Sequence, residues 1–389
     1  MDEWTSLLSL IPREPDWQIP WDGWKATDLH IWFEKMAATQ QNPLWHGEGD
    51  VWSHTQMVCE ELSAMETWRC LDKKQRQELF LAALLHDIGK VPCTRIEDGH
   101  FVSPNHTAVG ARMAREILWQ DMGLCGTDEA RTFRETVCSL IRYHSVPAHI
   151  LDQSDPERRL FKIASMGELA ADFSIKLLCI LEEADMRGRV FPRIAESVDM
   201  VRLCAELAEE QGCLNGPGSF PSAYARHAYL SGRKIQPGQD LYDDTWGEIV
   251  LLSGLPGTGK DTWVHENFAD LPMVSLDVIR KQKGISPLDD QGPVAAFARE
   301  QAKEYLRKKQ PFVWNATNLT PSIREKQVRL FQDYHASVRI VFLETTWEEQ
   351  LRRNKNRADE VPEQIIRRML RNLVLPERFE AQRVEWESV

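Results

Sequence analysis

Residues 249–260 read Ile-Val-Leu-Leu-Ser-Gly-Leu-Pro-Gly-Thr-Gly-Lys, a short apolar run followed by a glycine-rich turn that ends in lysine. Between a strand and a helix, glycines let backbone N–H groups point inward at phosphate oxygens, and the lysine neutralises the charge of those oxygens. The alternative is a glycine-rich turn without a ligand. The β-rich run directly before the turn favours a phosphate-binding loop that follows the first strand of a sheet.

The region that begins at Gly247 alternates short β-rich runs with helical stretches. This alternation is typical of a parallel sheet whose strands are joined by crossover helices. The expected strands cover residues 249–252, 273–276, 312–314 and 338–343.

Residues 1–212 have apolar side chains at helical spacing and little strand alternation. One helix is expected over Lys74–Asp87, with Gly89 as the glycine that ends it. Ser53 is expected to cap a helix that runs to about residue 65, and Asn105 is expected to cap another. The N-terminal part is therefore predicted to be all-helical.

Glycine and proline are frequent between residues 213 and 245, and they interrupt regular structure. We therefore predict two domains, 1–212 and 246–389, joined by a linker over 213–245. A short helix over Ala223–Leu230 is expected inside the linker.

Composition limits the class of protein. The 389 residues can bury two full cores, and the N-terminus lacks the basic and apolar regions of a signal peptide. No apolar run reaches the length of a membrane span, and the eight scattered cysteines favour reduced thiols. We therefore expect a cytoplasmic protein without a membrane partner.

The net charge of −12 argues against passive coating of nucleic acid, which needs a basic footprint. Basic residues nevertheless outnumber acidic ones between Arg299 and Arg371. This stretch is either a local groove for a strand end or a solvated face of mixed charge.

His86 and Asp87 stand together at the end of an apolar run. The pair offers a nitrogen and an oxygen ligand at one point, which suits a borderline divalent metal. Alone, the pair favours a buried histidine in a core. Further candidate ligands on the neighbouring predicted helices shift the balance to a metal site, and they are His54, His106, His144 and Asp185. His100 is an alternative to His106, which we prefer because it opens a clear helix.

This order of ligands resembles the HD phosphohydrolase superfamily over roughly residues 30–190. The resemblance implies that His54, His86, Asp87 and Asp185 bind one metal, and that His106 and His144 complete a two-metal site. It implies one or two divalent transition metal ions (Mn²⁺, Co²⁺, Ni²⁺ or Zn²⁺), with Asp87 catalytic as the ligand that bridges them. Lys90 would be a phosphate contact in that family, and a charge at the end of a helix is the alternative.

Residues 41–55 resemble the HD domain of bacterial tRNA nucleotidyltransferases more closely. Those domains act on 2′-phosphates and 2′,3′-cyclic phosphates of RNA. The resemblance implies that His46 and Glu48 border the substrate. Alternatively, Trp45, His46 and Trp52 only pack the entry loop.

The C-terminal region resembles the P-loop 5′-hydroxyl polynucleotide kinases. The resemblance implies that Asp277 is the general base and that Lys260, Arg353 and Arg357 act on the transferring phosphate. The alternative for both arginines is a solvated surface, and the nearby Arg352 and Lys355 leave their assignment open. The implied substrate contacts are Arg280, Thr317 and Asn318. The implied nucleotide-binding residues are Gly254, Leu255, Pro256, Gly257, Thr258, Gly259, Lys260, Asp261 and Thr262.

The loop departs from the common pattern, in which Ser or Thr follows the lysine and binds Mg²⁺. Asp261 stands there, followed by Thr262. Asp261 can hold Mg²⁺ directly or through water, and Thr262 is either a ligand or only a helix cap. Both interpretations remain open at this stage.

Together the two halves resemble the bacterial HD-domain polynucleotide kinases. The implied fold class is multidomain α plus α/β: an all-helical HD domain followed by a P-loop kinase with a parallel sheet. The implied function is removal of 2′/3′ or 2′,3′-cyclic phosphate and phosphorylation of 5′-hydroxyl ends by ATP (or another NTP) with Mg²⁺. The substrate ends belong to RNA, with DNA as an alternative, and a separate RNA ligase would follow because no Lys-x-Asp-Gly string is present.

Two other functions remain. One is an HD nucleotidase fused to a small-molecule P-loop kinase. The other is a nucleotide-binding regulator whose histidine cluster is structural.

Overall fold

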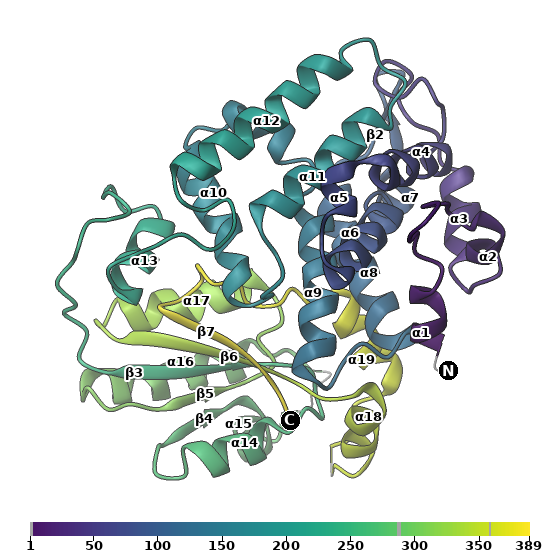
Figure 1. The fold of residues 1–389 in the computed structure, drawn as a ribbon. Helices are drawn as coiled ribbons and strands as arrows, with labels where there is room; N and C mark the ends of the chain where they lie inside the picture. Colours follow the sequence, from purple (N-terminus) through teal and green to yellow (C-terminus); the bar gives the residue numbers. More distant parts are fainter. Residues whose placement is uncertain (1–2, 286–288, 358) are drawn as a thin grey trace. The chain divides into compact units, whose positions relative to one another are not determined.

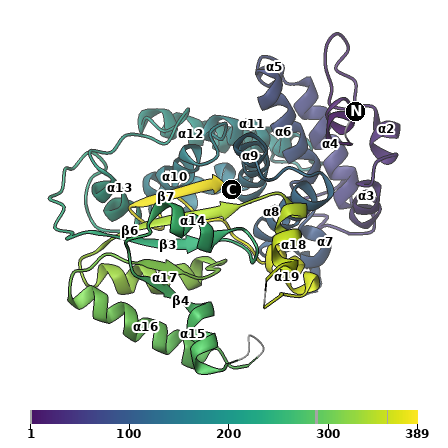
Figure 2. The ribbon, with the colours of Figure 1, turned by 90° about the horizontal axis from the view of Figure 1, so that it is seen from below.

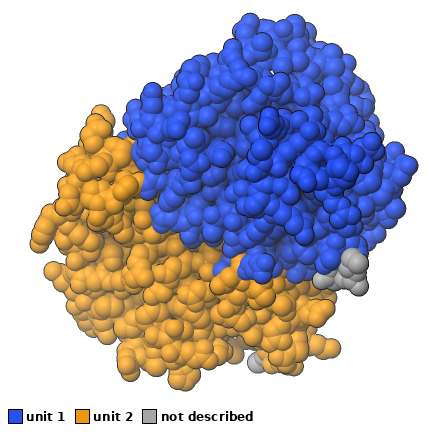
Figure 3. All heavy atoms as spheres, in the orientation of Figure 1, with its two compact units in different colours: residues 1–124, 129–218 blue, residues 125–128, 219–389 orange. Residues whose placement is uncertain are grey.

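The computed structural model describes residues 3–285, 289–357 and 359–389 (Figure 1). The chain forms two compact units, which are residues 1–124 with 129–218 and residues 125–128 with 219–389 (Figure 3). The division at residues 218 and 219 falls inside the stretch 213–245 that was predicted to be a linker.

The first unit is built from helices, with one short antiparallel hairpin, β1 (Arg95–Glu97) and β2 (His100–Val102). Its shorter helices include a π-helix over Ile117–Asp121 and 3₁₀ turns over Pro147–Asp152 and Ser165–Glu168. The α-helices are α1 (Glu3–Leu8), α2 (Trp21–Lys25), α3 (His30–Ala37), α4 (Val51–Ala64), α5 (Glu66–Arg69), α6 (Lys73–Leu85), α7 (Lys90–Cys93), α8 (His106–Glu116), α9 (Asp128–Tyr143), α10 (Pro156–Ala164), α11 (Ile175–Arg187) and α12 (Ile194–Glu210).

Helix α6 lies at the centre of this unit. Its residues from Glu78 to Leu85 are all buried, which is the pattern of a helix enclosed on every side. Helices α4 and α11 pack against α6 and against each other. The pair His86–Asp87 follows α6 directly, so it emerges inside the protein.

Gly89 does not end a helix as the sequence predicted. Helix α6 ends at Leu85, and Gly89 has an ordinary φ of −67° as the residue before α7. A glycine is needed at this position because the backbone of α8 passes very close to it. A Cβ on Gly89 would lie 2.0 Å from the carbonyl oxygen of His106 and 2.5 Å from the backbone nitrogen of Gly110. The absent side chain therefore lets the His86–Asp87 turn contact the backbone of α8.

The predicted cap of α4 is also wrong. Asp50 caps this helix, because its side chain accepts hydrogen bonds from the backbone nitrogens of Trp52 and Ser53. Ser53 lies inside the helix and donates its hydroxyl to the Asp50 carboxylate at 2.8 Å. The predicted position of Asn105 before α8 is confirmed, although its side chain makes no capping hydrogen bond.

The second unit contains a five-stranded parallel sheet in the order β4-β5-β3-β6-β7. Helices α15 and α16 of this unit lie side by side (Figure 2). Its elements are α13 (Ala223–Leu230), β3 (Glu248–Ser253), α14 (Lys260–Asn267), β4 (Met273–Ser275), α15 (Leu276–Lys283), α16 (Gly292–Arg307), β5 (Val313–Asn315), α17 (Pro321–Gln332), β6 (Ser337–Glu344), α18 (Trp347–Lys355), α19 (Glu363–Arg371) and β7 (Arg383–Ser388).

Helices cover both faces of the sheet. On one face, Val250 and Val313 form a buried cluster with Trp263 and Val264 of α14. On the other, Trp314 packs against Phe331 of α17, with ring centroids 5.9 Å apart. Because neighbouring residues of a strand point to opposite faces, the central strands must be apolar throughout. This explains the four runs that the sequence revealed. The strand β7 has more polar residues and was not predicted.

The helix expected inside the linker is confirmed as α13. It belongs to the second unit, because Arg226 donates to the carbonyl oxygen of Gln382 at 2.7 Å. The His227 ring contacts the carbonyl oxygen of Phe379 at 3.1 Å. Among the described helices, none has the length and apolar composition needed to cross a bilayer.

The contact at Gly89 generates a test of the fold. Gly89→Ala should destabilise the first unit by about 1–3 kcal/mol or more, because the methyl group must displace the backbone of α8. The matched control is Gly216→Ala, since a Cβ at Gly216 meets open space. Urea denaturation followed by circular dichroism measures both variants. Equal stability of the two variants would contradict the close approach.

Candidate functional site

The six predicted metal ligands converge in the first unit although they come from five helical segments. His54 lies on α4, His86 and Asp87 follow α6, and Asp185 lies on α11. His106 begins α8, and His144 follows α9. Potential ligand atoms within 4.8 Å of one another form overlapping groups: His54, His86 and Asp87; His86, His144 and Asp185; Asp87, His106 and His144.

All four imidazoles of the cluster are oriented in the same way. In each ring, Nδ1 lies within hydrogen-bond distance of a backbone carbonyl oxygen, which leaves Nε2 directed into the cluster. Such a bond to the other ring nitrogen is typical of metal-binding histidines, because it fixes the tautomer and the ring plane. The pairs are His54 with Gly188 (3.1 Å), His86 with Ala83 (2.7 Å), His106 with Ser103 (2.8 Å) and His144 with Ile141 (2.8 Å).

The carboxylate of Asp87 lies between two pairs of imidazoles. Its Oδ2 is 3.3 Å from Nε2 of His86 and 3.7 Å from Nε2 of His54. Its Oδ1 is 3.4 Å from Nε2 of His106 and 3.9 Å from Nε2 of His144. Among the described residues, Oδ1 has no hydrogen-bond partner despite its burial. A buried acceptor without a partner, facing imidazole nitrogens, fits a site for divalent ions.

The pKa shifts of His144, His106, Asp87 and Asp185 fit metal binding, which requires neutral imidazoles and charged carboxylates. His54 differs, because Asp185 and Glu48 outweigh its burial and raise its pKa. Burial lowers the pKa of His144 to about 3, and burial likewise lowers the pKa of His106. Burial acts to raise the pKa of Asp87, but Lys90 and His86 outweigh it and hold this pKa well below the usual value. Arg189 and His54 do the same for Asp185.

Lys90 lies within the cluster. Its ammonium nitrogen is 2.7 Å from Oδ2 of Asp87 and donates to Oε1 of Gln41, also at 2.7 Å. Lys90 is the first residue of the four-residue helix α7 and so also lies in its last turn, a position that fits a phosphate contact and a charge at a helix end alike. A positive charge thus lies directly beside Asp87.

Two residues that hold the ligands were missed or only partly recognised from the sequence. Arg189 binds both oxygens of Asp185, at 3.1 and 2.7 Å. Glu48 lies 3.0 Å from Nδ1 of His54 and 2.7 Å from Nδ1 of His46, so it contacts a ligand as well as the entry loop. The four-residue spacing of Asp185 and Arg189 is a signal that would have found the first.

The glycine-rich loop of the second unit joins β3 to α14. Gly259 precedes the helix with φ of +91°, a conformation that favours glycine. Lys260 donates to the carbonyl oxygens of Gly254 (3.0 Å) and Leu255 (2.8 Å). Burial, together with the nearby charge of Arg357, lowers the pKa of Lys260 to about 8. Residues 254–258 are all buried, whereas Gly259 and Lys260 are partly exposed.

Asp277 lies at the start of α15 between two arginines. Arg280 forms a short ion pair with its Oδ1, and Arg357 lies 2.9 Å from its Oδ2. Burial acts to raise the pKa of Asp277, but Arg280 and Arg357 outweigh it, so the pKa is lowered. The carboxylate is therefore ionised at neutral pH, and its lowered pKa makes it a weaker proton acceptor than a free aspartate.

The two arginines predicted to act on phosphate both reach the site. Arg357 contacts Asp277, and Arg353 donates to the carbonyl oxygen of Thr258 in the loop at 3.4 Å. Both Arg352 and Arg353 pair with Glu349 at 2.6 Å, but the side chain of Arg352 is 66% exposed and that of Arg353 is 35% exposed. This placement favours Arg353 over Arg352 for the predicted role.

Asp261 and Thr262 are distinguished by their surroundings. Oδ1 of Asp261 accepts a hydrogen bond of 2.5 Å from Asn315 at the end of β5. Thr262 is exposed and does not cap α14, whose cap position is Gly259. Thr262 is therefore not the cap of this helix. Asp261 offers the oxygen that lies beside the loop.

Thr317 and Asn318, which were predicted to bind the substrate, make hydrogen bonds that stabilise the fold. The carbonyl oxygen of Thr317 accepts from the backbone nitrogen of Gly254 at 3.0 Å, so it supports the loop. Asn318 is buried, and its side chain donates to the carbonyl oxygen of Leu252 at 2.6 Å. A substrate contact in this segment falls more naturally to Thr317, which is partly exposed.

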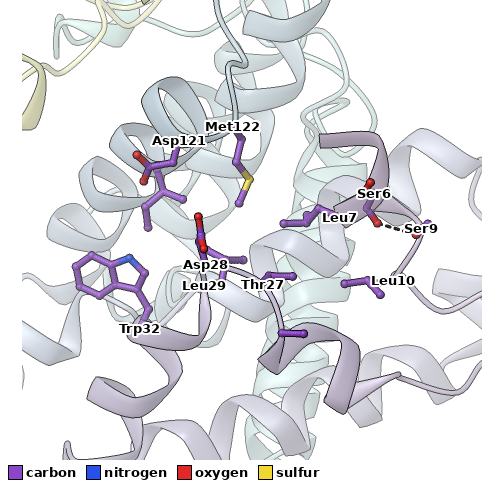
Figure 4. Close-up of a pocket in the computed structure, with 12 residues that line it drawn as sticks. Ser6, Leu7, Ser9, Leu10, Thr27, Asp28, Leu29, Trp32, Asp121 and Met122 are labelled. Carbon is purple, nitrogen blue, oxygen red and sulfur yellow. Dashed lines mark hydrogen bonds between the residues drawn. The ribbon is translucent and has the colours of Figure 1, made fainter. Parts of the chain in front are cut away.

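The first unit also contains a pocket of about 440 Å³ among its N-terminal helices and the π-helix (Figure 4). Trp32 and Asp28 line it from one side, and Asp121 and Met122 line it from another. None of the predicted metal ligands is among its described lining residues.

Comparison with known families agrees with this geometry. Residues 50–172 match the family model described as HD domain, and residues 249–376 match the one described as AAA domain. The chain is an HD phosphohydrolase domain fused to a P-loop kinase-like domain. The HD match ends before Asp185, so the comparison does not cover this predicted ligand.

Similarity to individual proteins is limited. The chain is 27% identical over 149 residues to heterogeneous nuclear ribonucleoprotein U-like protein 2 of Mus musculus and 26% identical to that of Homo sapiens. Each match covers 34% of this chain and 20% of the relative, so the chain spans about a fifth of the length of these relatives. A gluconokinase structure from Sinorhizobium meliloti 1021 matches with 21% identity and a TM-score of 0.28, covering 36% of this chain and 82% of the gluconokinase.

The position of Asp87 predicts the effect of its removal. Asp87→Ala should lose bound metal and the release of 2′(3′)-phosphate, because both oxygens that face the imidazole pairs disappear. Metal content and phosphate release are measured after the same divalent-metal reconstitution. Asp152→Ala is the control, because Asp152 is an exposed carboxylate of the same unit. If Asp87→Ala keeps its metal and its phosphate release, the histidines are packing residues.

Proposed function

We propose that this protein is a bifunctional RNA end-healing enzyme. Its HD site removes 2′/3′ or 2′,3′-cyclic phosphate, and its P-loop site phosphorylates 5′-hydroxyl ends with ATP. The observation that carries the proposal is that one chain combines a site suited to phosphate removal with a site suited to hydroxyl phosphorylation. Cleavage of RNA to a cyclic phosphate and a 5′-hydroxyl leaves ends that need both changes before a separate ligase seals them.

In the HD site, His54, His86, Asp87 and Asp185 would hold one ion, and His106 and His144 would hold a second ion with Asp87. Bound ions would activate a water molecule and stabilise charge on phosphate oxygens. Lys90 is placed to neutralise an anionic oxygen of the substrate, because its ammonium already contacts Asp87. Arg189 keeps Asp185 charged and oriented through two hydrogen bonds.

In the P-loop site, the backbone N–H groups of residues 257–259 and the ammonium of Lys260 would bind the nucleotide phosphates. Asp277 would accept the proton of the 5′-hydroxyl group while the oxygen of that hydroxyl bonds to the γ-phosphorus of ATP. The bond between the γ-phosphorus and the oxygen of the β-phosphate breaks, and ADP leaves. Arg353 and Arg357 would stabilise the charge on the transferring group. Mg²⁺ would neutralise phosphate charge, with Asp261 as its protein ligand.

Arg280 would contact the phosphate of the terminal nucleotide while also fixing Asp277. A substrate with such a phosphate is a polynucleotide end rather than a free nucleoside, which distinguishes this proposal from a small-molecule kinase. The matched relatives are named ribonucleoproteins, which agrees with an RNA substrate.

End-group analysis of an RNA with a 2′,3′-cyclic phosphate and a 5′-hydroxyl tests the whole proposal. The wild type should yield a 5′-phosphate and free 2′ and 3′ hydroxyls. Lys260→Ala should abolish the 5′ change, because it removes a phosphate contact, and should leave phosphate removal near wild type. Free nucleosides incubated with labelled ATP test the alternative that the P-loop site is a small-molecule kinase. Loss of both activities in a folded Lys260→Ala protein would contradict two independent sites.

A second variant tests the base of the transfer reaction. Asp277→Asn keeps the shape but removes the proton acceptor, so ATP binding should persist while transfer falls about 100- to 10,000-fold. Rates of 5′ phosphorylation and nucleotide affinity are measured for wild type and variant. Near wild-type transfer would exclude Asp277 as the general base.

A further inference from the structure

An exposed apolar patch lies next to the HD site. It is formed by Leu44, Trp45, Val190 and Phe191, which we call the aromatic patch. Leu44 is 62% exposed, Trp45 51% and Val190 54%. The rings of Trp45 and Phe191 contact each other with centroids 5.1 Å apart and an angle of 43° between their planes. Contiguous apolar side chains on a surface usually mark a binding site.

Both segments of the aromatic patch continue directly into the metal cluster. Trp45 is followed by His46, whose ring packs against His54 with centroids 4.8 Å apart. Val190 follows Arg189, which holds Asp185 through two hydrogen bonds. The patch is therefore joined along the chain to residues that contact the buried cluster.

Hydrogen bonds hold the two segments of the patch together. The backbone nitrogen of Gly47 donates to the carbonyl oxygen of Val190 at 3.0 Å, and that of Val190 donates to Oε2 of Glu48 at 2.9 Å. A Cβ on Gly47 would lie 2.9 Å from the carbonyl oxygen of Val190, so the segments meet without room for a side chain. Oε1 of Glu48 in turn contacts His54 at 3.0 Å. The position of Trp45 is thus tied to that of a predicted metal ligand.

We propose that Trp45 and Phe191 bind the terminal nucleobase of the polynucleotide whose 2′ or 3′ phosphate enters the HD site. This inference rests on the proposed function. The phosphate and the base of a terminal nucleotide are attached to one ribose, so a base platform must adjoin the phosphate site. Exposed aromatic rings supply such platforms by stacking. The patch offers only the indole N–H as a polar group, so it should accept all four bases with similar efficiency.

The test compares two oligonucleotides that end in a 3′-phosphate and differ only at the last nucleotide, which is either normal or abasic. Trp45→Ala should lower kcat/KM for the normal end about 5- to 150-fold, the range for one lost base–aromatic stack. Its activity on the abasic end should equal that of the wild type. Trp45→Phe should retain most of the activity on the normal end, because it keeps an aromatic ring.

A binding measurement complements the kinetics. Stacking should quench the fluorescence of a 2-aminopurine placed at the last position in the wild type, and Trp45→Ala should abolish this quenching. Metal content should be the same in the variant and the wild type. Tyr242→Ala is the control, because Tyr242 is 89% exposed and lies in the other unit.

The outcomes separate the inference from the proposed function. If the wild type releases phosphate from neither oligonucleotide, the proposed function fails and the inference fails with it. If the wild type is active but Trp45→Ala has full efficiency on the normal end, only the inference is overturned. Equal losses on both oligonucleotides would indicate a structural role and also overturn it. A changed oligomeric state of Trp45→Ala, measured by light scattering, would instead assign the patch to contacts between copies of this chain.

Discussion

The first unit depends on the burial of one charged carboxylate. Asp87 is 1% exposed, and an uncompensated buried charge would cost several kcal/mol. The ammonium of Lys90 at 2.7 Å compensates this charge, and imidazole nitrogens surround the carboxylate. The segments that carry these groups must therefore pack around the point where Asp87 emerges from α6. Close approach at Gly89 brings α8 and His106 to that point. Packing and electrostatics thus both require the same helices to surround Asp87.

In the second unit, polar and charged groups gather at the carboxyl ends of the parallel strands. The loop after β3 presents backbone nitrogens, and the segment after β4 begins with Asp277 between two arginines. Asn315 at the end of β5 orients Asp261 in the first turn of α14. Because the carboxyl ends of parallel strands meet at one edge of the sheet, these groups come together without any long loop.

The acidic composition of the chain is compatible with a nucleic-acid substrate if recognition is confined to the ends. A protein that coats a strand needs many phosphate contacts, which a net charge of −12 disfavours. An enzyme that acts on ends needs a few charges at the reacting phosphate and a surface for the adjoining base. In the proposed function, Lys90 in the first unit and Arg280 in the second would supply such charges, and the aromatic patch would supply the surface for the base.

The sequence by itself determined the type and order of the elements and most of the candidate ligands. Strands buried on both faces must be continuously apolar, so β3 and β6 were visible as runs, whereas β7 was not. His86–Asp87 and the loop ending in Lys260 were visible because their chemistry depends on neighbours in the chain. Only the tertiary structure decided the pairs that are distant in sequence. Packing between separate elements brings together Glu48 with His54, Asp261 with Asn315, and Arg357 with Asp277. It also produces the close approach at Gly89. Local spacing encodes periodicity and motifs, but side chains on different elements meet only where those elements pack, and no local pattern records that contact.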